Sequence, residues 1–297
     1  MGIRRQELAF LAECRAAGVS FAKTLTIGRQ QMLVTTRELR TFLAQQSLMS
    51  QVEIDGIDAT DRRWAFLDEL LRLMGAEVVE SIDITPRDEA TVMADLNEPI
   101  PESMHSTFTA VFDGGSLEHI FNAPLALRSY MEALSPGGHL MIQTCGNGFF
   151  GHGFYQFSPE FFHRTLSPEN GFQLETFTAM KDRARAARFE VGDPDEHGQR
   201  VELATRGRVI LLVRAKKLRN QRLCQPLPLQ SDVPAWRLPE EATHRTKFKH
   251  RALDKAQMLS PALAAFLVRG YNRLMLLPIV GHPRSFLNRA SFKRVRR

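Results

Sequence analysis

The chain has 297 residues, which is enough for one large domain or for one domain with an appendage. Its apolar fraction of 43% supports a substantial core, and its charged fraction of 24% is ordinary for a globular protein. The three cysteines lie far apart in no metal-ligand spacing, which argues against a disulfide framework and a structural zinc site. This cysteine usage fits a reducing compartment.

The N-terminal segment lacks the features of a targeting sequence. Glu7 and Glu13 interrupt its apolar positions, so a signal peptide is not expected. No window of the sequence reaches the roughly 18 uncharged apolar residues that a membrane span requires. We therefore expect a cytoplasmic protein.

Charge is distributed unevenly along the chain. From Lys216 onward there are 18 Lys and Arg against 4 Asp and Glu, a net charge of +14. The preceding part holds 21 basic and 29 acidic residues, a net charge of −8. A mildly acidic body joined to a strongly basic tail suggests an anionic partner for the tail alone.

Apolar periodicity predicts strands that alternate with helices over residues 1–217. In one expected helix Asp61 is the N-cap, Gly75 marks the end, and a continuous apolar stripe lies between them. The expected helices cover residues 4–17, 35–46, 61–75, 158–166 and a segment from 122 to the glycines at 137–138. The expected strands cover residues 21–28, 76–83, 90–97, 108–113, 139–145, 171–180 and 208–217.

Short apolar strands separated by helices predict a parallel sheet covered on both faces. Only a charged loop separates the last two strands, which is typical of an antiparallel hairpin. We therefore predict a three-layer α/β domain over residues 1–217 and a basic, proline-punctuated extension over residues 218–297. In such sheets ligands bind beyond the carboxyl ends of the strands. Asp113, Gly114, Gly115 and the Glu118–His119 pair follow a strand and belong to that edge.

The order of these elements resembles that of class I S-adenosylmethionine-dependent methyltransferases, in particular the small-molecule group called type 11. The similar motifs are LEH at 117–119, PGG at 136–138, FSPE at 157–160 and GF at 171–172. The resemblance extends over about residues 75–180 and implies a Rossmann-like methyltransferase fold. That fold has a mostly parallel seven-stranded sheet with a C-terminal antiparallel hairpin. It also implies S-adenosyl-L-methionine as cofactor and a small molecule, lipid head group or glycan as methyl acceptor.

The resemblance assigns cofactor roles to residues at strand ends. Asp83 matches the acidic residue that accepts both ribose hydroxyls, a task that suits a carboxylate; it could instead begin a local turn. Asp95 matches the residue that contacts the adenine amino group, with Leu96 beside the ring, although the same residues could form a local turn. The turn of Asp113, Gly114 and Ser116, followed by Leu117, would complete the pocket.

The first glycine loop departs from the family pattern. The family has several glycines after its first strand, because the backbone must approach the cofactor closely. Here Gly28 stands alone and could provide that approach or form a plain bend. Arg29 or Gln30 could contact the methionine carboxylate. Cofactor binding is therefore either remodelled or lost.

Two histidines are candidates for the chemistry. Methyl transfer depends mainly on positioning and exclusion of water, with a general base where the acceptor must lose a proton. His119 would lie beside the cofactor, where it could also be structural. His152 lies in a glycine-punctuated aromatic loop that would form a wall of the acceptor pocket or only cover the end of the sheet. No HxxxH or HxE spacing and no carboxylate cluster predicts a metal site.

The basic tail allows three interpretations. Interleaved basic and apolar residues suit an amphipathic element on an anionic membrane surface, which would place the protein at the inner face of the membrane. The apolar segment could instead dock on the domain or on a second subunit. Nucleic acid is disfavoured because the body has no basic stripe.

Two functions follow from the sequence. The first is an S-adenosylmethionine-dependent methyltransferase. The second is a catalytically silent methyltransferase-like module for binding or scaffolding, which the incomplete glycine loop favours.

Overall fold

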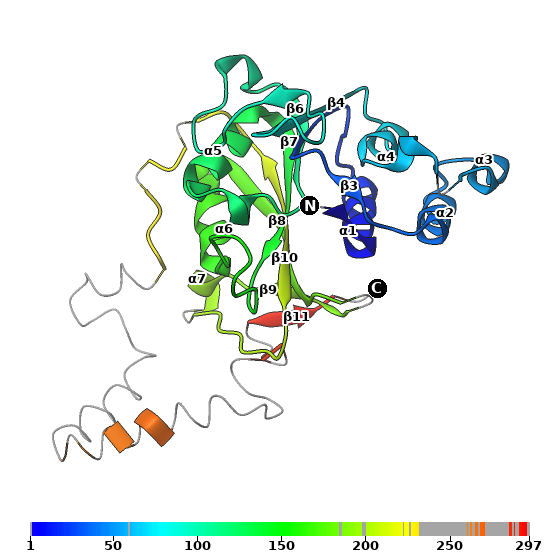
Figure 1. The fold of residues 1–297 in the computed structure, drawn as a ribbon. Helices are drawn as coiled ribbons and strands as arrows, with labels where there is room; N and C mark the ends of the chain where they lie inside the picture. The colour runs from blue at the N-terminus through cyan, green and yellow to red at the C-terminus, as the bar shows by residue number, and fades with distance from the viewer. Residues whose placement is uncertain are drawn as a thin grey trace.

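The computed structural model describes residues 2–231 apart from 59, 184, 185, 198, 199, 222 and 226. Beyond 231 it describes residues 260, 262, 265, 266, 268–270, 285, 286, 288 and 291–295. A central sheet separates two layers of helices (Figure 1). One layer contains α1 (Arg5–Ala16), α2 (Thr36–Gln45), α3 (Gln51–Asp55) and α4 (Asp68–Leu73); the other contains α5 (Ala123–Ala133), α6 (Pro159–Thr165) and α7 (Pro194–His197).

Among the described residues, the main sheet has nine strands in the order β11-β9-β8-β10-β7-β6-β2-β4-β5. Five of them, from β5 to β7, are parallel and follow the third-second-first-fourth-fifth order of a doubly wound sheet. The strands are β2 (Lys23–Ile27), β4 (Val78–Asp83), β5 (Val92–Met93), β6 (Phe108–Asp113), β7 (Leu134–Cys145), β8 (Phe172–Lys181), β9 (Arg188–Val191), β10 (Val209–Lys217) and β11 (Phe292–Arg294).

The predicted three-layer, Rossmann-like α/β fold is confirmed, and so is the antiparallel pairing of its last two predicted strands. β10 is antiparallel to both β7 and β8. In the part of the chain that the structure describes, the sheet has nine strands instead of the predicted seven, because β9 pairs with β8 and β11 pairs with β9. β9 and α7 lie within the segment that the sequence predicts to be a charged loop.

The core occupies both faces of the sheet. Along β6, Phe108 and Val111 pack in the cluster that includes residues of α5. Ala110 and Phe112 pack in the other cluster, with residues of α1 and α4. A strand buried on both faces must be apolar at successive positions, which is why this segment shows no alternation.

The predicted single helix over residues 61–75 is wrong. Asp61 caps a one-turn 3-10 helix, η1 (Arg62–Trp64), and α4 begins only at Asp68. Between them, the Ala65 carbonyl accepts a hydrogen bond from Met32 N at 2.9 Å, and Leu67 N donates to the Gln30 carbonyl at 2.9 Å. The backbone here is paired with a distant segment, which an apolar stripe at helical spacing cannot reveal. The other 3-10 turns are η2 (Glu102–Met104), η3 (Leu117–His119) and η4 (Pro168–Asn170).

The same distant segment belongs to a second, two-stranded sheet. β3 (Gln31–Met32) lies parallel to β1 (Gly2–Ile3). The backbone that follows Gly28 is therefore held on one side by the N-terminus and on the other by residues 65–67.

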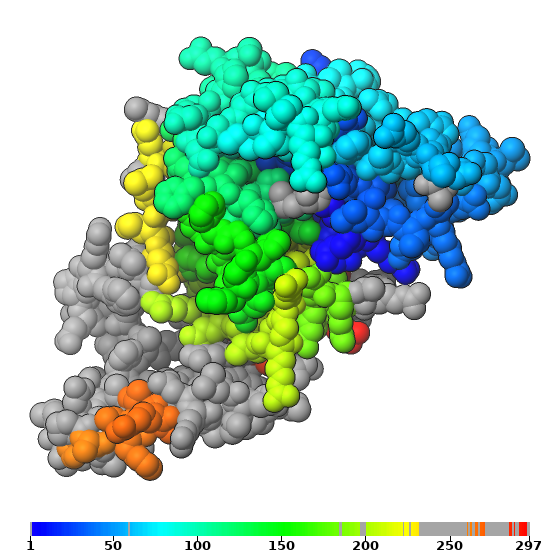
Figure 2. Space-filling view, viewed as in Figure 1, coloured from blue at the N-terminus to red at the C-terminus, as the bar shows by residue number. Residues whose placement is uncertain are grey.

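Part of the C-terminal extension packs against the sheet. Phe286 stacks on Phe189 with ring centroids 4.5 Å apart, and Phe292 in β11 is buried. The segment around residues 218–231, yellow in Figure 2, runs along the surface of the helical layer that contains α5 and α6. Most of the apolar and basic tail lies outside the described residues. Within the part of the chain that the structure describes, no helix is long and apolar enough to cross a membrane.

Candidate functional site

The carboxyl ends of β2, β4 and β6 meet where the strand order reverses. Ile27, the last residue of β2, pairs with Ile82 on one side and with Asp113 on the other. Gly28, Asp83 and Asp113 are thereby brought together, as the sequence predicts. In open α/β sheets this reversal is where a crevice for ligands forms.

Gly28 lies at the centre of this edge. Its φ of +68° is one that glycine adopts without strain. A Cβ at this position would lie 3.5 Å from Gln30 Nε2, 3.5 Å from Ser116 Oγ and 3.6 Å from Asp83 Oδ2. Three polar side chains therefore converge on the backbone of Gly28.

Asp83 is half-buried and uses one carboxylate oxygen for a local turn. Its Oδ1 accepts hydrogen bonds from Thr85 N at 2.9 Å and from Thr85 Oγ1 at 3.2 Å. Among the described residues its Oδ2, the oxygen near Gly28, has no hydrogen-bond donor. The turn is therefore present, and an acceptor oxygen at the edge remains. Ribose binding by Asp83 stays a prediction.

Asp95 and Leu96 are also engaged locally. Asp95 Oδ1 accepts hydrogen bonds from Asn97 N and Asn97 Nδ2, both at 2.8 Å, and Leu96 is buried in the core. The turn that the sequence allows at this position is present. Adenine binding by these residues stays a prediction.

Asp113 is fully buried and holds its own turn. Its Oδ1 accepts from the backbone N–H groups of Gly115 and Ser116, and its Oδ2 accepts from Leu117 N and Tyr130 Oη. Burial, with the nearby Glu118 carboxylate, raises the pKa of Asp113 to about 7. The carboxyl group faces the interior, so Asp113 holds the backbone of the turn in place and does not present its side chain at the edge.

Gln30 fills the space between Gly28 and the turn after β6. Only 1% of it is exposed, and its Nε2 donates to the Ile27 carbonyl at 2.5 Å. Ser116 Oγ donates to the same carbonyl at 2.8 Å. A Cβ at Gly114 would lie 2.5 Å from Gln30 Oε1, so the glycine there is needed by the chain's own glutamine. Gln30 Oε1 is buried and has no hydrogen-bond partner among the described residues.

Arg29, the other residue proposed for the methionine carboxylate, points elsewhere. Its guanidinium forms an ion pair with Asp68 at 3.3 Å and lies over the Phe66 ring, 4.1 Å from the ring centroid. The adjacent Gln30 is therefore the residue of this loop that reaches the switch point.

The two candidate histidines contact each other. Their rings are edge-on, with centroids 4.8 Å apart. The loop that carries His152 docks on the turn that carries His119, because Phe154 N donates to the Glu118 carbonyl at 2.7 Å. Partial burial lowers the pKa of His119. The sequence predicts both residues as candidates but not their contact.

The sequence places Glu118 at this edge but indicates no role of its own for it, and the structure shows its contacts. It is 3% exposed, its Oε2 accepts from Thr144 Oγ1 at 2.7 Å, and its Oε1 lies 3.3 Å from the Cys145 thiol. Burial and the Glu118 carboxylate together raise the pKa of Cys145. The signal in the sequence was a carboxylate between the apolar Leu117 and His119, directly after a buried strand.

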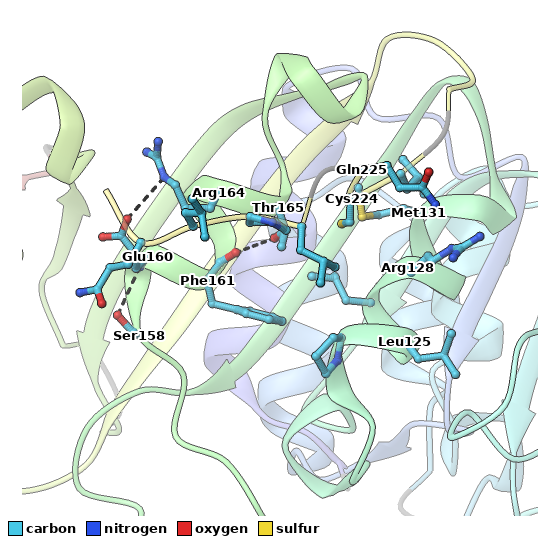
Figure 3. Close-up of a pocket in the computed structure, with 17 residues that line it drawn as sticks. Leu125, Arg128, Met131, Ser158, Glu160, Phe161, Arg164, Thr165, Cys224 and Gln225 are labelled. Atoms are coloured by element: carbon cyan, nitrogen blue, oxygen red, sulfur yellow. Dashed lines mark hydrogen bonds and ion pairs between the residues drawn. The ribbon is translucent and has the colours of Figure 1, made fainter. Parts of the chain in front are cut away.

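A large cavity lies away from this edge. It has a volume of about 800 Å³ and lies between α5, α6 and the segment around Cys224 (Figure 3). Its wall is mainly apolar, with Arg128, Glu160 and Arg164 among its polar members. Neither this cavity nor the second described cavity, at α2 and α3, is lined by a residue proposed for the cofactor.

No family model matches the chain, and neither does any curated protein. Several solved structures are similar to it. The S-adenosylmethionine-dependent methyltransferase of Mesorhizobium loti is 13% identical, with 72% of this chain and 98% of that chain covered and a TM-score of 0.36. The N-methyltransferase NodS of Bradyrhizobium japonicum is 11% identical, with coverages of 72% and 96% and a TM-score of 0.39. The branched-chain polyamine synthase of Thermus thermophilus is 15% identical, with coverages of 72% and 56% and a TM-score of 0.40. Likenesses this distant identify no site residue.

Proposed function

We propose that the chain is an S-adenosylmethionine-dependent methyltransferase that acts on a small molecule, a lipid head group or a glycan. The observation that carries the proposal is the convergence of Gly28, Asp83 and the Asp113–Ser116 turn at the switch point of the sheet. Asp83 Oδ2 supplies an acceptor for the ribose there, and Gly28 lets a ligand approach the backbone closely.

The cofactor would supply an electrophilic methyl group, and the protein would bind it, orient it and exclude water. Asp83 and Gly28 would hold the ribose side, with Asp95 and Leu96 toward the adenine. The acceptor would approach from the loop that carries His152. Phe121 and Phe154 form an exposed edge-on pair there, with centroids 5.5 Å apart, which suits an acceptor that has an apolar part.

His152 is the better placed general base of the two histidines. It lies in the loop that carries Phe154, from which we propose the acceptor approaches, whereas partial burial lowers the pKa of His119 and makes it the weaker proton acceptor. A neutral imidazole of His152 could take the proton of a hydroxyl or amine acceptor.

Asp83→Asn tests the cofactor site while keeping the turn. The amide oxygen can still accept from Thr85, but the amide nitrogen would replace the Oδ2 acceptor. Loss of hydrogen bonds to a charged group, about 1.5–3 kcal/mol each, should weaken S-adenosylmethionine binding by at least about 10-fold in calorimetric titration. Thr85→Val is the matched control, because it perturbs the turn and leaves the carboxylate. Equal affinities in Asp83→Asn and wild type would mean that the ribose site is elsewhere.

The second candidate function is a catalytically silent binding or scaffolding module. The observation that favours it is Gln30, whose side chain occupies the space beside Gly28 and Gly114. Absence of binding of both S-adenosylmethionine and S-adenosylhomocysteine, by wild type and by Gln30→Ala, would support this function. Binding by the variant alone would identify a site that is blocked by its own glutamine.

We further propose that the basic tail binds an anionic membrane surface. Support comes from the net charge of residues 218–297, which hold 16 Lys and Arg against 4 Asp and Glu, a net charge of +12. Co-sedimentation of the full chain with anionic and with neutral vesicles tests this. Equal sedimentation with the two kinds of vesicle would rule it out.

A further inference from the structure

The geometry points to a zinc-binding site formed by Glu118, Cys145 and His152, which the proposed methyl transfer does not require and which, with zinc bound, would replace the proposed base role of His152. The carboxylate, the thiol and the imidazole each offer one ligand atom, and these atoms all lie within 4.8 Å of one another. They come from three separate segments: the η3 turn, the end of β7 and the loop after it.

The ligand types suit zinc. Zn²⁺ binds cysteine sulfur at about 2.3 Å and histidine nitrogen or carboxylate oxygen at about 2.0–2.2 Å. In a tetrahedral arrangement these bond lengths place ligand atoms about 3.3–3.6 Å apart. Glu118 Oε1 and Cys145 Sγ already lie 3.3 Å apart. Closing the site therefore requires a movement of only about 1 Å by the imidazole.

His152 lies on the segment best able to make that movement. Glycines flank it, with φ values of +83° at Gly151 and +69° at Gly153. The two other ligands are held in place: Glu118 and Cys145 are 3% and 2% exposed. With two ligands held in position and the third on a loop that can move, a metal ion could draw the third ligand into its coordination sphere.

Neighbouring groups orient the ligands. Thr144 Oγ1 donates to Glu118 Oε2 at 2.7 Å, which leaves Oε1 directed at the sulfur. His119 packs edge-on against His152. Outer contacts of this kind fix the geometry of ligating carboxylates and imidazoles.

Zinc binding would release one proton. The Cys145 thiol loses its proton to the buffer and the thiolate sulfur binds zinc, because a coordinating thiol is deprotonated by the ion. Glu118 Oε1 exchanges its hydrogen bond from the thiol for a bond to the metal. Three protein ligands leave a fourth position for water or for an acceptor atom, as in catalytic zinc sites.

Cobalt titration of the full-length, chelator-treated protein tests the site. Co²⁺ reports both cysteine ligation, through a sulfur-to-metal charge-transfer band, and four-coordinate geometry, through visible absorption. We expect one equivalent of Co²⁺ to produce both signals and one equivalent of Zn²⁺ to remove them by displacement. Cys145→Ser should abolish the charge-transfer band, and His152→Ala should weaken binding by at least about 10-fold, within the range for loss of metal-site interactions.

Cys224→Ser is the matched control, since this half-buried cysteine lies outside the cluster, and it should leave the spectrum unchanged. His152→Ala alters an exposed loop, so it stays informative even if Cys145→Ser does not fold. Absence of a cobalt signal at micromolar concentrations in wild type would overturn the proposal. So would a charge-transfer band that persists unchanged in His152→Ala and Cys145→Ser. The titration contains no S-adenosylmethionine, so its outcome is independent of the proposed methyltransferase function.

Discussion

The side chain of Gln30 fills the space beside Gly28 at the carboxyl edge of the sheet, and Gln30→Met measures how firmly it is held there. Methionine has the same unbranched shape as glutamine but makes no strong hydrogen bond. The substitution therefore removes the two polar atoms of a side chain that is 1% exposed and leaves its volume largely in place.

The contacts of the amide allow the magnitude to be worked out. The lost bonds are those from Nε2 to the Ile27 carbonyl at 2.5 Å and to the Gly28 carbonyl at 3.4 Å; the second is long and weak, so the two together are worth about 1 kcal/mol net. The Ile27 carbonyl keeps its bond from Ser116 Oγ, and Gly28 is half-buried, so no fully buried acceptor is left unsatisfied. Removal of Oε1, which is buried with no partner among the described residues, relieves a penalty of about 1–3 kcal/mol. The free energy of unfolding should therefore stay within about 1 kcal/mol of wild type or rise by up to about 2 kcal/mol.

Urea unfolding of the full chain, with m-values equal in the two proteins, checks this. A loss of more than about 2 kcal/mol would refute the reasoning, because it would mean that the amide is well satisfied and hard to displace. Gln30→Ala gives a second measurement, in which the side chain is removed. If displacing the side chain costs little free energy, removing it in this variant should raise the affinity for S-adenosylmethionine by less than about 10-fold.

Three further predictions concern stability. Lys217 Nζ is buried and donates to the carbonyls of Met131 and Leu134, and burial lowers the pKa of Lys217 to about 8 from 10.5. Between these two pH values the unfolded chain binds more protons than the folded chain, so the free energy of unfolding should rise with pH from 8 to 10.5 by up to about 3 kcal/mol. Urea titrations should show that Lys217→Met removes this rise. Gly153→Ala should destabilise more than Gly151→Ala, because both need positive φ but only at 153 would a Cβ come within 2.5 Å of the Glu118 carbonyl; equal thermal midpoints would contradict this. Tyr130→Phe removes the hydroxyl that donates to Asp113; above the Asp113 pKa of about 7, where the carboxyl group is ionised, it should cost about 1.5–3 kcal/mol of unfolding free energy, and a change below about 0.5 kcal/mol would show that this bond adds little.

Much of the fold was predictable because it depends on short-range patterns. The capping residue Thr35 accepts from Glu38 N, and Ser158 accepts from Glu160 N, as such residues do at helix starts. The strand at 108–113 was recognisable because burial on both faces makes most of its consecutive positions apolar, with Thr109 and Asp113 as the exceptions. Residues 65–67 could not be predicted, because their hydrogen bonds go to residues 30–32, and no local pattern records that pairing.

The candidate site, like the fold, was predictable only in part. Its location was predictable, since residues that follow parallel strands meet at one edge whatever the loops do. Its contents were not. The contact of His119 with His152 and the approach of Glu118 to Cys145 each join segments about 30 residues apart, and they depend on how one loop docks on one turn.

From the amino-acid sequence one can predict a parallel sheet covered by helices on both faces, with Gly28, Asp83 and Asp113 at the ends of its strands. Periodicity and the alternation of strands with helices are enough for that, because they can be read from consecutive residues. Tertiary structure alone decided that Gln30 fills the space beside Gly28, and that residues 292–294 add a strand at the far end of the sheet. It also decided that a carboxylate, a thiol and an imidazole share one cluster. The physical reason is that side-chain packing between distant segments sets these positions, whereas local conformational preference sets the elements that bring them together.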